Sequence, residues 1–272
     1  MLSRNLFALL CLILLISCSS VEQQNIYKPV RFEIIQEIQT KFTPNKCLYS
    51  FVNKTVFALN KESSEIHIFK GGKKINTIGG IGFEQTNFTK LSDITLAPDG
   101  SLLAMDSFEK TIKKFDTEGK FITSIYLTDF SEPTLFAVAS DETFYIYDSD
   151  RNEIITFSRL NEYDTFTFGR FQFTKPDNLQ LAGNLLIINE IALNHTLVFS
   201  TFGQLEQELD GYYQIERNQK YLLQSNYISP ENSEEKYAVS IKGWKYFSQN
   251  DSYTILTSKE KILVGKFVYE VR

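Results

Sequence analysis

The chain has 272 residues, of which 28 are Lys or Arg and 33 are Asp or Glu, so its formal net charge at pH 7 is −5. This acidic balance argues against nucleic acid as a partner, because contacts with a phosphate backbone demand clustered Lys and Arg. The length suits one large domain with a well-buried core, and the 23 Phe and 14 Tyr, against one Trp and two His, favour strands.

The first seventeen residues have the anatomy of an export signal. Arg4 precedes an apolar run over residues 6–16, and this order of a basic and then an apolar segment is typical of a secretory signal peptide. A bilayer needs about 20 apolar residues to be spanned by a helix. Because the run is shorter than that, we expect residues 1–17 to be removed as a signal peptide.

A cysteine stands at the expected cleavage point. Leu15, Ile16, Ser17 and Cys18 together resemble the lipobox of bacterial lipoproteins. The resemblance implies diacylglycerol on the thiol of Cys18, cleavage just before it, and a fatty acid such as palmitate on the new amino group. Several acyl chains give stable membrane residence, where one chain gives marginal binding. The alternative is an export signal without lipidation.

Two further expectations follow from this resemblance. Ser19 stands where an Asp marks inner-membrane retention in enterobacterial lipoproteins, so placement in the outer membrane of the cell envelope is favoured. Residues 18–30 would form a lipidated polar tether, and residues 31–272 the folded domain. Cys11 leaves with the signal and Cys18 carries lipid, so Cys47 has no disulfide partner and is expected to be a small buried residue.

An internal repeat of about forty-two residues runs through the folded domain. The repeat is registered on Phe69, Phe115, Phe157 and Phe199, and a further step reaches Ile241. Turn-forming residues keep the same phase sixteen residues earlier, at Asn53, Asp99, Asp141 and Gly183. A second set stands nine residues earlier, at Asn60, Asp106, Asp148 and Glu190. A third set, at Gly119, Asn161 and Gly203, follows the Phe by four residues.

Each repeat therefore reads as four strands joined by three tight turns. In the clearest repeat the strands are expected over residues 94–97, 102–105, 111–115 and 121–125. Four antiparallel strands per repeat make one blade of a β-propeller. The second strands are apolar on both faces, which suits a sheet packed between neighbouring blades.

Residues 79–121 resemble the NHL repeat. They contain a glycine-rich lead, a turn at Pro98, Asp99 and Gly100, and an apolar strand that ends in Asp106. The segment departs from the NHL pattern at Leu91, where Pro is usual, and at Glu109, where Asn is common. The match is strong here and becomes faint after residue 210. The resemblance implies a β-propeller.

The length and the period predict an all-β, six-bladed propeller of four-stranded antiparallel blades. Blades one to five are expected over residues 45–80, 88–127, 131–169, 174–210 and 211–247. The C-terminal strands 252–258, 261–264 and 266–271 number three, so the strand over residues 32–38 is expected to complete the last blade. Such a closure removes exposed sheet edges. An open or seven-bladed ring is the alternative.

The sequence contains few residues that could carry catalysis. His67 and His195 are its only histidines, and both fall on third strands, where a strand-filling role is expected. No Ser-His-Asp order, phosphate-binding glycine loop or zinc-type spacing is present. We therefore expect no cofactor, and the sequence favours a non-enzymatic role while leaving enzymatic activity open.

Five carboxylates form the main alternative to a non-enzymatic role. The blade rotation is expected to place Asp93, Asp106, Asp148, Asp177 and Glu190 on one rim of the propeller. Oxygen ligands there could hold Ca²⁺, or each acid could cap its own turn. The leading hypothesis is a membrane-anchored scaffold that binds a protein, peptide or glycan. The rivals are a metal-dependent hydrolase or lyase, and a structural member of a larger envelope complex.

Overall fold

The structure, a computed structural model, describes residues 27–80, 82, 84–158, 166–216, 219–224, 227–231, 236–238, 245–250 and 253–271. The predicted signal peptide, Cys18 and residues 19–26 of the tether lie outside these ranges and remain predictions. In the described residues the helical content is one 3₁₀ turn, η1 (Ile191–Leu193). None of these residues forms a helix with the length and hydropathy needed to span a membrane.

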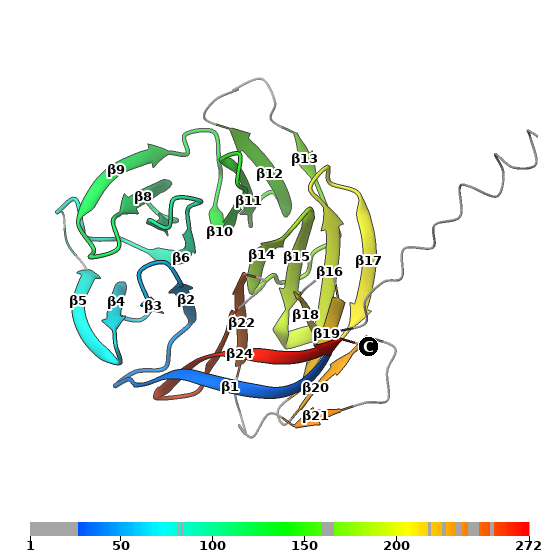
Figure 1. Cartoon of the computed structure of the whole chain (residues 1–272). Helices are drawn as coiled ribbons and strands as arrows, with labels where there is room; N and C mark the ends of the chain where they lie inside the picture. The colour runs from blue at the N-terminus through cyan, green and yellow to red at the C-terminus, as the bar shows by residue number, and fades with distance from the viewer. Residues whose placement is uncertain are drawn as a thin grey trace, which may run out of the picture.

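Six four-stranded antiparallel sheets account for the strands of this part of the chain, and Figure 1 shows them arranged in a ring. Blades one to three consist of β2 (Lys46–Ser50), β3 (Thr55–Asn60), β4 (Glu65–Lys70) and β5 (Lys73–Gly79); β6 (Leu91–Leu96), β7 (Leu102–Asp106), β8 (Thr111–Phe115) and β9 (Phe121–Tyr126); and β10 (Pro133–Val138), β11 (Thr143–Asp148), β12 (Glu153–Ser158) and β13 (Thr167–Phe168).

Blades four to six complete the ring. They consist of β14 (Asn178–Ala182), β15 (Leu185–Glu190), β16 (His195–Ser200) and β17 (Leu205–Asp210); β18 (Tyr212–Glu216), β19 (Gln219–Gln224), β20 (Tyr227–Pro230) and β21 (Tyr237–Ala238); and β22 (Lys245–Asn250), β23 (Tyr253–Thr257), β24 (Lys261–Val271) and β1 (Tyr27–Gln39). The predicted six-bladed, all-β fold is therefore confirmed.

The N-terminal strand closes the ring, as the sequence predicted. β1 pairs antiparallel with β24, with Phe32 opposite Phe267 and Ile38 opposite Ile262. Figure 1 shows the two strands side by side, although they come from opposite ends of the chain. This pairing covers an edge of β24 that would otherwise expose unpaired backbone groups.

The boundaries of the last two blades differ from the prediction. β22 begins blade six at Lys245, whereas the sequence pattern gave that segment to blade five. β24 is one continuous strand, whereas the sequence pattern divided this segment into strands over residues 261–264 and 266–271. A Cβ at Gly265 would lie 2.4 Å from Cζ of Phe32 and 2.6 Å from the carbonyl oxygen of Glu33. Glycine is needed here for the close approach of β1, not for a turn.

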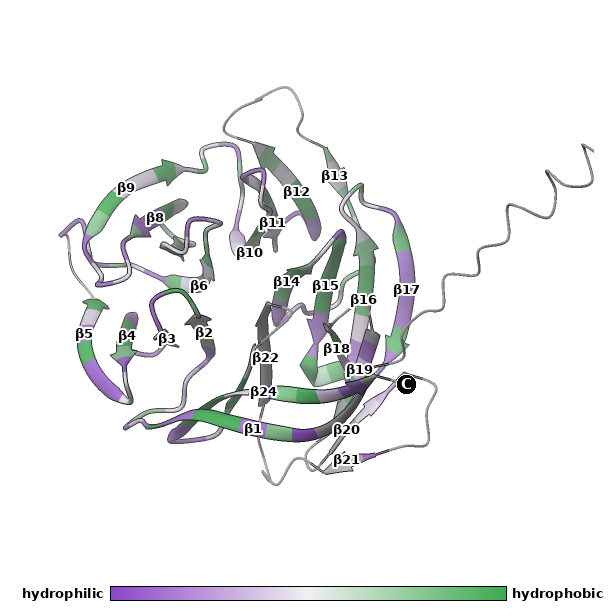
Figure 2. Ribbon diagram, in the orientation of Figure 1, coloured by the Kyte–Doolittle hydropathy of each residue, from purple (hydrophilic) through white to green (hydrophobic). Residues whose placement is uncertain are grey.

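The core lies between neighbouring blades. One hydrophobic cluster joins blade one to blade two through Phe57, Ile66, Ile94, Leu102 and Phe115, among other residues. All five residues of β7 are buried, which agrees with a strand covered on both faces. Figure 2 shows the contrast at the perimeter, where the outer strand β17 is more hydrophilic than its neighbour β16.

The phenylalanines that register the repeat occupy the third strands. Phe69, Phe115 and Phe199 are buried and Phe157 is half-buried, on β4, β8, β16 and β12 respectively. The residue one further step along, Ile241, lies outside the described residues. The predicted turn chemistry is also present, because Gly119 has a φ of 92° and Asp99 Oδ1 accepts the amide of Ser101 at 2.9 Å.

Candidate functional site

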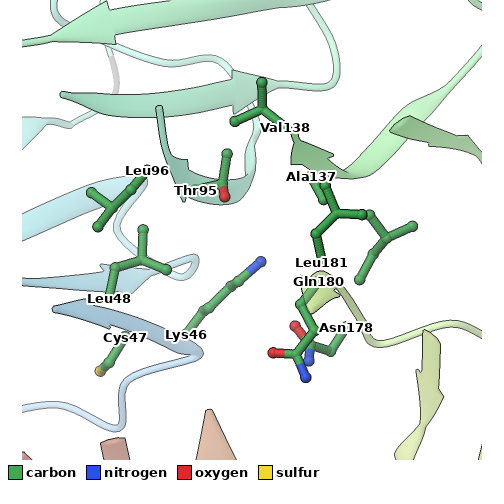
Figure 3. A pocket seen from close by; sticks show the side chains of 11 residues that line it. Lys46, Cys47, Leu48, Thr95, Leu96, Ala137, Val138, Asn178, Gln180 and Leu181 are labelled. Atoms are coloured by element: carbon green, nitrogen blue, oxygen red, sulfur yellow. The ribbon is translucent and has the colours of Figure 1, made fainter. Parts of the chain in front are cut away.

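The first strands of four blades enclose a small cavity at the centre of the ring. The cavity has a volume of about 110 Å³ and is lined by residues of β2, β6, β10 and β14. Figure 3 shows the side chain of Lys46 pointing into it, toward Thr95 and Gln180. Cys47 lies on the same strand and is fully buried, as predicted, and burial raises the pKa of its thiol. The wall of this cavity carries a cation and several amide and hydroxyl groups.

Asp93, one of the five carboxylates singled out in the sequence, is the anion nearest to this cation. Its Oδ1 accepts a hydrogen bond from Lys46 Nζ at 2.8 Å, and its Oδ2 accepts the amide of Phe136 at 3.0 Å. Asp93 is 1% exposed. These contacts join the first strands of blades one, two and three, so Asp93 has a structural role at the centre of the propeller.

A second lysine lies near the same charges. Lys61, in the turn between β3 and β4, keeps contact with solvent. Desolvation lowers the pKa of Lys61; the carboxylates of Asp93 and Asp177 oppose this shift, and the ammonium of Lys46 adds to it. The charges of Lys46, Asp93 and Asp177 therefore act on Lys61, and we call these four residues, from three blades, the central group.

Asp106 and Asp148 end the second strands of blades two and three, as the repeat predicted, and both bind backbone amides of their own blade. Asp106 accepts the amides of Thr89 at 2.6 Å and Lys90 at 3.2 Å, just before the first strand. Asp148 accepts the equivalent amides, those of Ser131 at 2.7 Å and Glu132 at 3.1 Å. Both carboxylates are fully buried. They hold the connection between blades against the second strand.

Glu190 and Asp177 act in the same way in blade four. Glu190 Oε1 accepts the amides of Thr174 at 2.6 Å and Lys175 at 2.5 Å. Asp177 Oδ2 accepts the amide of Ile191 at 2.8 Å. Across the described residues, no three His, Cys, Asp or Glu side chains come together as a metal site would require. The cation-binding role of the five carboxylates gains no support from this geometry and stays a prediction.

The two histidines lie on third strands of separate blades, where the sequence placed them. His67 on β4 packs against the ring of Phe42, with centroids 4.4 Å apart, and its Nε2 lies 3.2 Å from Glu65 Oε2. Burial lowers the pKa of His67, and the positive charge of Lys74 lowers it further. His195 Nδ1 lies 3.2 Å from Glu190 Oε2. Each histidine is engaged locally, and neither lines the central cavity.

A buried polar network joins blade four to blade five. Asn189 Nδ2 donates to Thr196 Oγ1 at 3.0 Å and to the carbonyl of Tyr213 at 3.1 Å. Thr196 Oγ1 donates to the carbonyl of Gly211 at 2.7 Å and accepts the amide of Tyr213 at 3.0 Å. Because both side chains are fully buried, this network orders the start of the weakly patterned fifth blade.

Sequence reasoning missed Lys46 and Lys61, which supply the positive charge of the central group. Neither falls on the repeat positions used to register the blades. One signal could have found Lys46: it stands at the start of an inner strand, as Asp93 does in the next blade. Opposite charges at corresponding positions of neighbouring first strands favour an ion pair between the two blades.

The ring of six four-stranded blades, closed by the N-terminal strand, defines this chain as a six-bladed β-propeller. No protein-family model matches its sequence, and no curated protein does.

Solved structures show where this fold recurs. The chain is similar to virginiamycin B lyase from Staphylococcus aureus in two structures. One is a catalytically inactive histidine-to-alanine variant with quinupristin, at 16% identity and a TM-score of 0.55, covering 82% of this chain and 80% of that one. The other is a selenomethionine form, at 14% identity and a TM-score of 0.55, covering 88% of this chain and 100% of that one. It is also similar to a streptogramin B lyase, at 11% identity and a TM-score of 0.56, covering 89% of this chain and 100% of that one. At these identities the likeness shows the fold alone.

Proposed function

We propose that the chain is a lipid-anchored β-propeller of the bacterial cell envelope that binds a protein or peptide partner on one face. We call this the rim face: the end of the blades where second strands turn into third strands and where one blade connects to the next. The proposed anchor rests on the resemblance of the segment ending in Cys18 to a lipobox. The proposed NHL character of the blades rests on residues 79–121.

Exposed hydrophobic side chains on the rim face carry this proposal. Phe108, Phe171 and Leu193 are 68%, 81% and 51% exposed. They lie in the β7–β8 turn, in the connection from β13 to β14, and in η1. Aromatic side chains that give up large exposed areas on association are typical anchors of protein interfaces.

Phe171 is held outward by an unusual backbone conformation. Its φ is 66°, in the left-handed region that bulky side chains rarely adopt. Arg170 lies over the ring, with its guanidinium carbon 5.2 Å from the centroid. Backbone strain of this kind is concentrated at binding and catalytic sites. Phe171 is therefore the residue that we expect to contact the partner.

A binding role is favoured over a lyase role. One of the similar lyase structures is an inactive histidine variant, whereas the two histidines of this chain lie on third strands and face Glu65 and Glu190. The likeness to the lyases is compatible with a propeller that serves binding or catalysis, and the exposed aromatic side chains of the rim face favour binding.

Site-specific crosslinking tests the proposed face. With a photoreactive phenylalanine analogue in place of Phe108, irradiation of intact cells is expected to give one discrete adduct. Phe171→Ser in the same chain should abolish that adduct. Phe202→Ser is the matched control, because Phe202 is 86% exposed in the β16–β17 turn at the other end of the blades. Equal loss of the adduct in both variants, or its persistence in Phe171→Ser, would contradict the proposal.

The anchor is tested by Cys18→Ala. This variant is expected to accumulate as uncleaved precursor and to incorporate no labelled palmitate, because the thiol is the proposed acceptor of the lipid. Cys11→Ser, a cysteine within the predicted signal peptide, should be processed and labelled like the natural chain. Metabolic labelling followed by membrane fractionation reports both steps. Normal processing of Cys18→Ala would refute the anchor.

A further inference from the structure

A second cavity, larger than the central one, lies at the perimeter of blade two. It has a volume of about 500 Å³, within the range of small-ligand sites. Its walls come from the connection between β5 and β6, from the β7–β8 turn and from the outer strands β8 and β9. Figure 1 shows β5 and β9 next to each other on the outside of the ring, away from the first strands β2 and β10.

One buried polar group on this wall has no partner. Thr111 is 6% exposed, lines the cavity, and its Oγ1 makes no hydrogen bond with any of the described residues. It lies in register between Asp106 on β7 and Tyr126 on β9, and both of these residues also line the cavity. A buried hydroxyl without a partner is unfavourable. A ligand with a polar group in this cavity would satisfy it.

The charge of the lining favours a cation. Glu84, Asp106 and Glu109 line the cavity together with a single lysine, Lys113. The ammonium of Lys113 is already engaged, because it donates to the carbonyl of Asn87 and lies 5.0 Å from the centroid of the Phe88 ring.

The three carboxylates differ in how many hydrogen bonds they already accept. Asp106 is occupied by the amides of Thr89, Lys90, Phe108 and Glu109. Glu84 and Glu109, in contrast, are exposed to solvent and form no ion pair with the residues that the structure describes, although Glu109 Oε1 accepts a hydrogen bond from Thr89 Oγ1 at 3.1 Å. Glu109 and Asp106 already act on the ammonium of Lys113, but three carboxylates line this wall together with one lysine, so the wall still attracts a further positive charge.

The remaining wall is apolar and aromatic. Phe121, Ile122 and Tyr126 line the cavity, and Ile122 and Tyr126 are 51% and 71% exposed. An exposed aromatic ring favours a nearby cation through its negative face. Apolar side chains beside carboxylates also suit an alkyl stem that ends in a charged group.

We propose that this cavity binds a primary ammonium group on an aliphatic stem, the chemistry of a lysine side chain presented by a peptide. Glu84 and Glu109 would pair with the ammonium, Thr111 Oγ1 would accept a hydrogen bond from one of its N–H groups, and Tyr126 and Ile122 would cover the stem. This site is separate from Phe171 and goes beyond the proposed function of the rim face.

Calorimetric titration of the purified full chain tests the proposal with two matched probes. Nα-acetyl-lysine amide carries the ammonium, and Nα,Nε-diacetyl-lysine amide has the same stem without the charge. The charged probe is expected to bind at least about tenfold more tightly, because a charge-assisted hydrogen bond is lost on acetylation. Equal binding of the two probes, or no binding of the charged one, would overturn the proposal.

Two variants and two controls then locate the site. Glu109→Gln and Thr111→Val should each weaken binding of the charged probe, by about tenfold for Glu109→Gln. Glu118→Gln, which neutralises an exposed carboxylate in the β8–β9 turn, is the control and should bind like the natural chain. Equal affinity of Glu109→Gln and Glu118→Gln would refute the site. Phe171→Ser should bind the probe normally, so failure here and failure of the rim-face proposal are distinguishable.

Discussion

Replacement of Asp93 by Leu is expected to lower the free energy of unfolding by about 3 kcal/mol, because it leaves a largely buried ammonium without its counter-ion. Lys46 is 12% exposed in its side chain and Asp93 is 1% exposed, so water cannot fully replace the lost carboxylate. The amide of Phe136 loses its acceptor as well. Urea denaturation followed by circular dichroism measures the change.

The double variant Lys46→Met, Asp93→Leu separates the ion pair from the packing. Removing both charges should recover much of the lost stability, since an apolar pair of similar volume often replaces a buried ion pair at little cost. A double variant as unstable as Asp93→Leu alone would show that the charges do not interact, contrary to the 2.8 Å contact.

The surface ion pair of Lys114 and Asp99 provides the matched control. Its atoms are 2.6 Å apart, but the Asp99 side chain is 58% exposed, so Asp99→Asn should cost less than about 1 kcal/mol. Burial raises the pKa of Asp99, but hydrogen bonds from Lys114 and Ser101 outweigh it and lower the pKa to about 2. The small stabilisation is therefore present at neutral pH and is lost as the pH falls from about 4 toward about 2.

Asp106→Ala is expected to have a comparable effect, also about 3 kcal/mol, because it removes the acceptor of four backbone amides at once. These amides belong to Thr89, Lys90, Phe108 and Glu109, at 2.6, 3.2, 3.0 and 3.0 Å. The carboxylate is fully buried, and without it the connection between blades one and two loses its attachment to β7. Thermal unfolding and hydrogen exchange at Thr89 and Lys90 would measure the two effects.

Asp116→Ala is the control for this prediction. Asp116 also accepts two amides, those of Glu118 and Lys120 at 2.9 and 2.8 Å, but it does so in an exposed hairpin turn. Water can replace it there, so the loss should stay below about 1 kcal/mol. Equal losses for Asp106→Ala and Asp116→Ala would contradict the argument that burial makes the rim aspartate important.

The blades could be predicted because their determinants are local. Turn formers such as Asp99 and Gly119 and apolar second strands such as β7 act within about forty residues of sequence, so the repeated pattern reports each blade directly. Prediction was less accurate at blades five and six, where the repeat fades. The role of Gly265, for example, depends on a strand that lies more than 200 residues away in sequence.

The candidate sites were predicted less well for a related physical reason. The rim carboxylates were found because they recur, but recurrence could not separate a metal ligand from a turn cap; the bonds of Asp106 to its own blade support the second role. The perimeter cavity arises where the connection between two blades passes over outer strands. No pattern within a single repeat describes that contact.

The sequence alone determined the class of fold, the number of blades and their closure by the N-terminal strand, since strand period, turn residues and apolar patterning act over short separations. The tertiary structure decided which charges share a site: Lys46 pairs with Asp93 between neighbouring blades, and Glu84 and Glu109 line one cavity with Thr111 at the perimeter. The physical reason is that rotation about the propeller axis and the course of the connections bring distant residues together, and the electrostatics of each site depend on these distances in space.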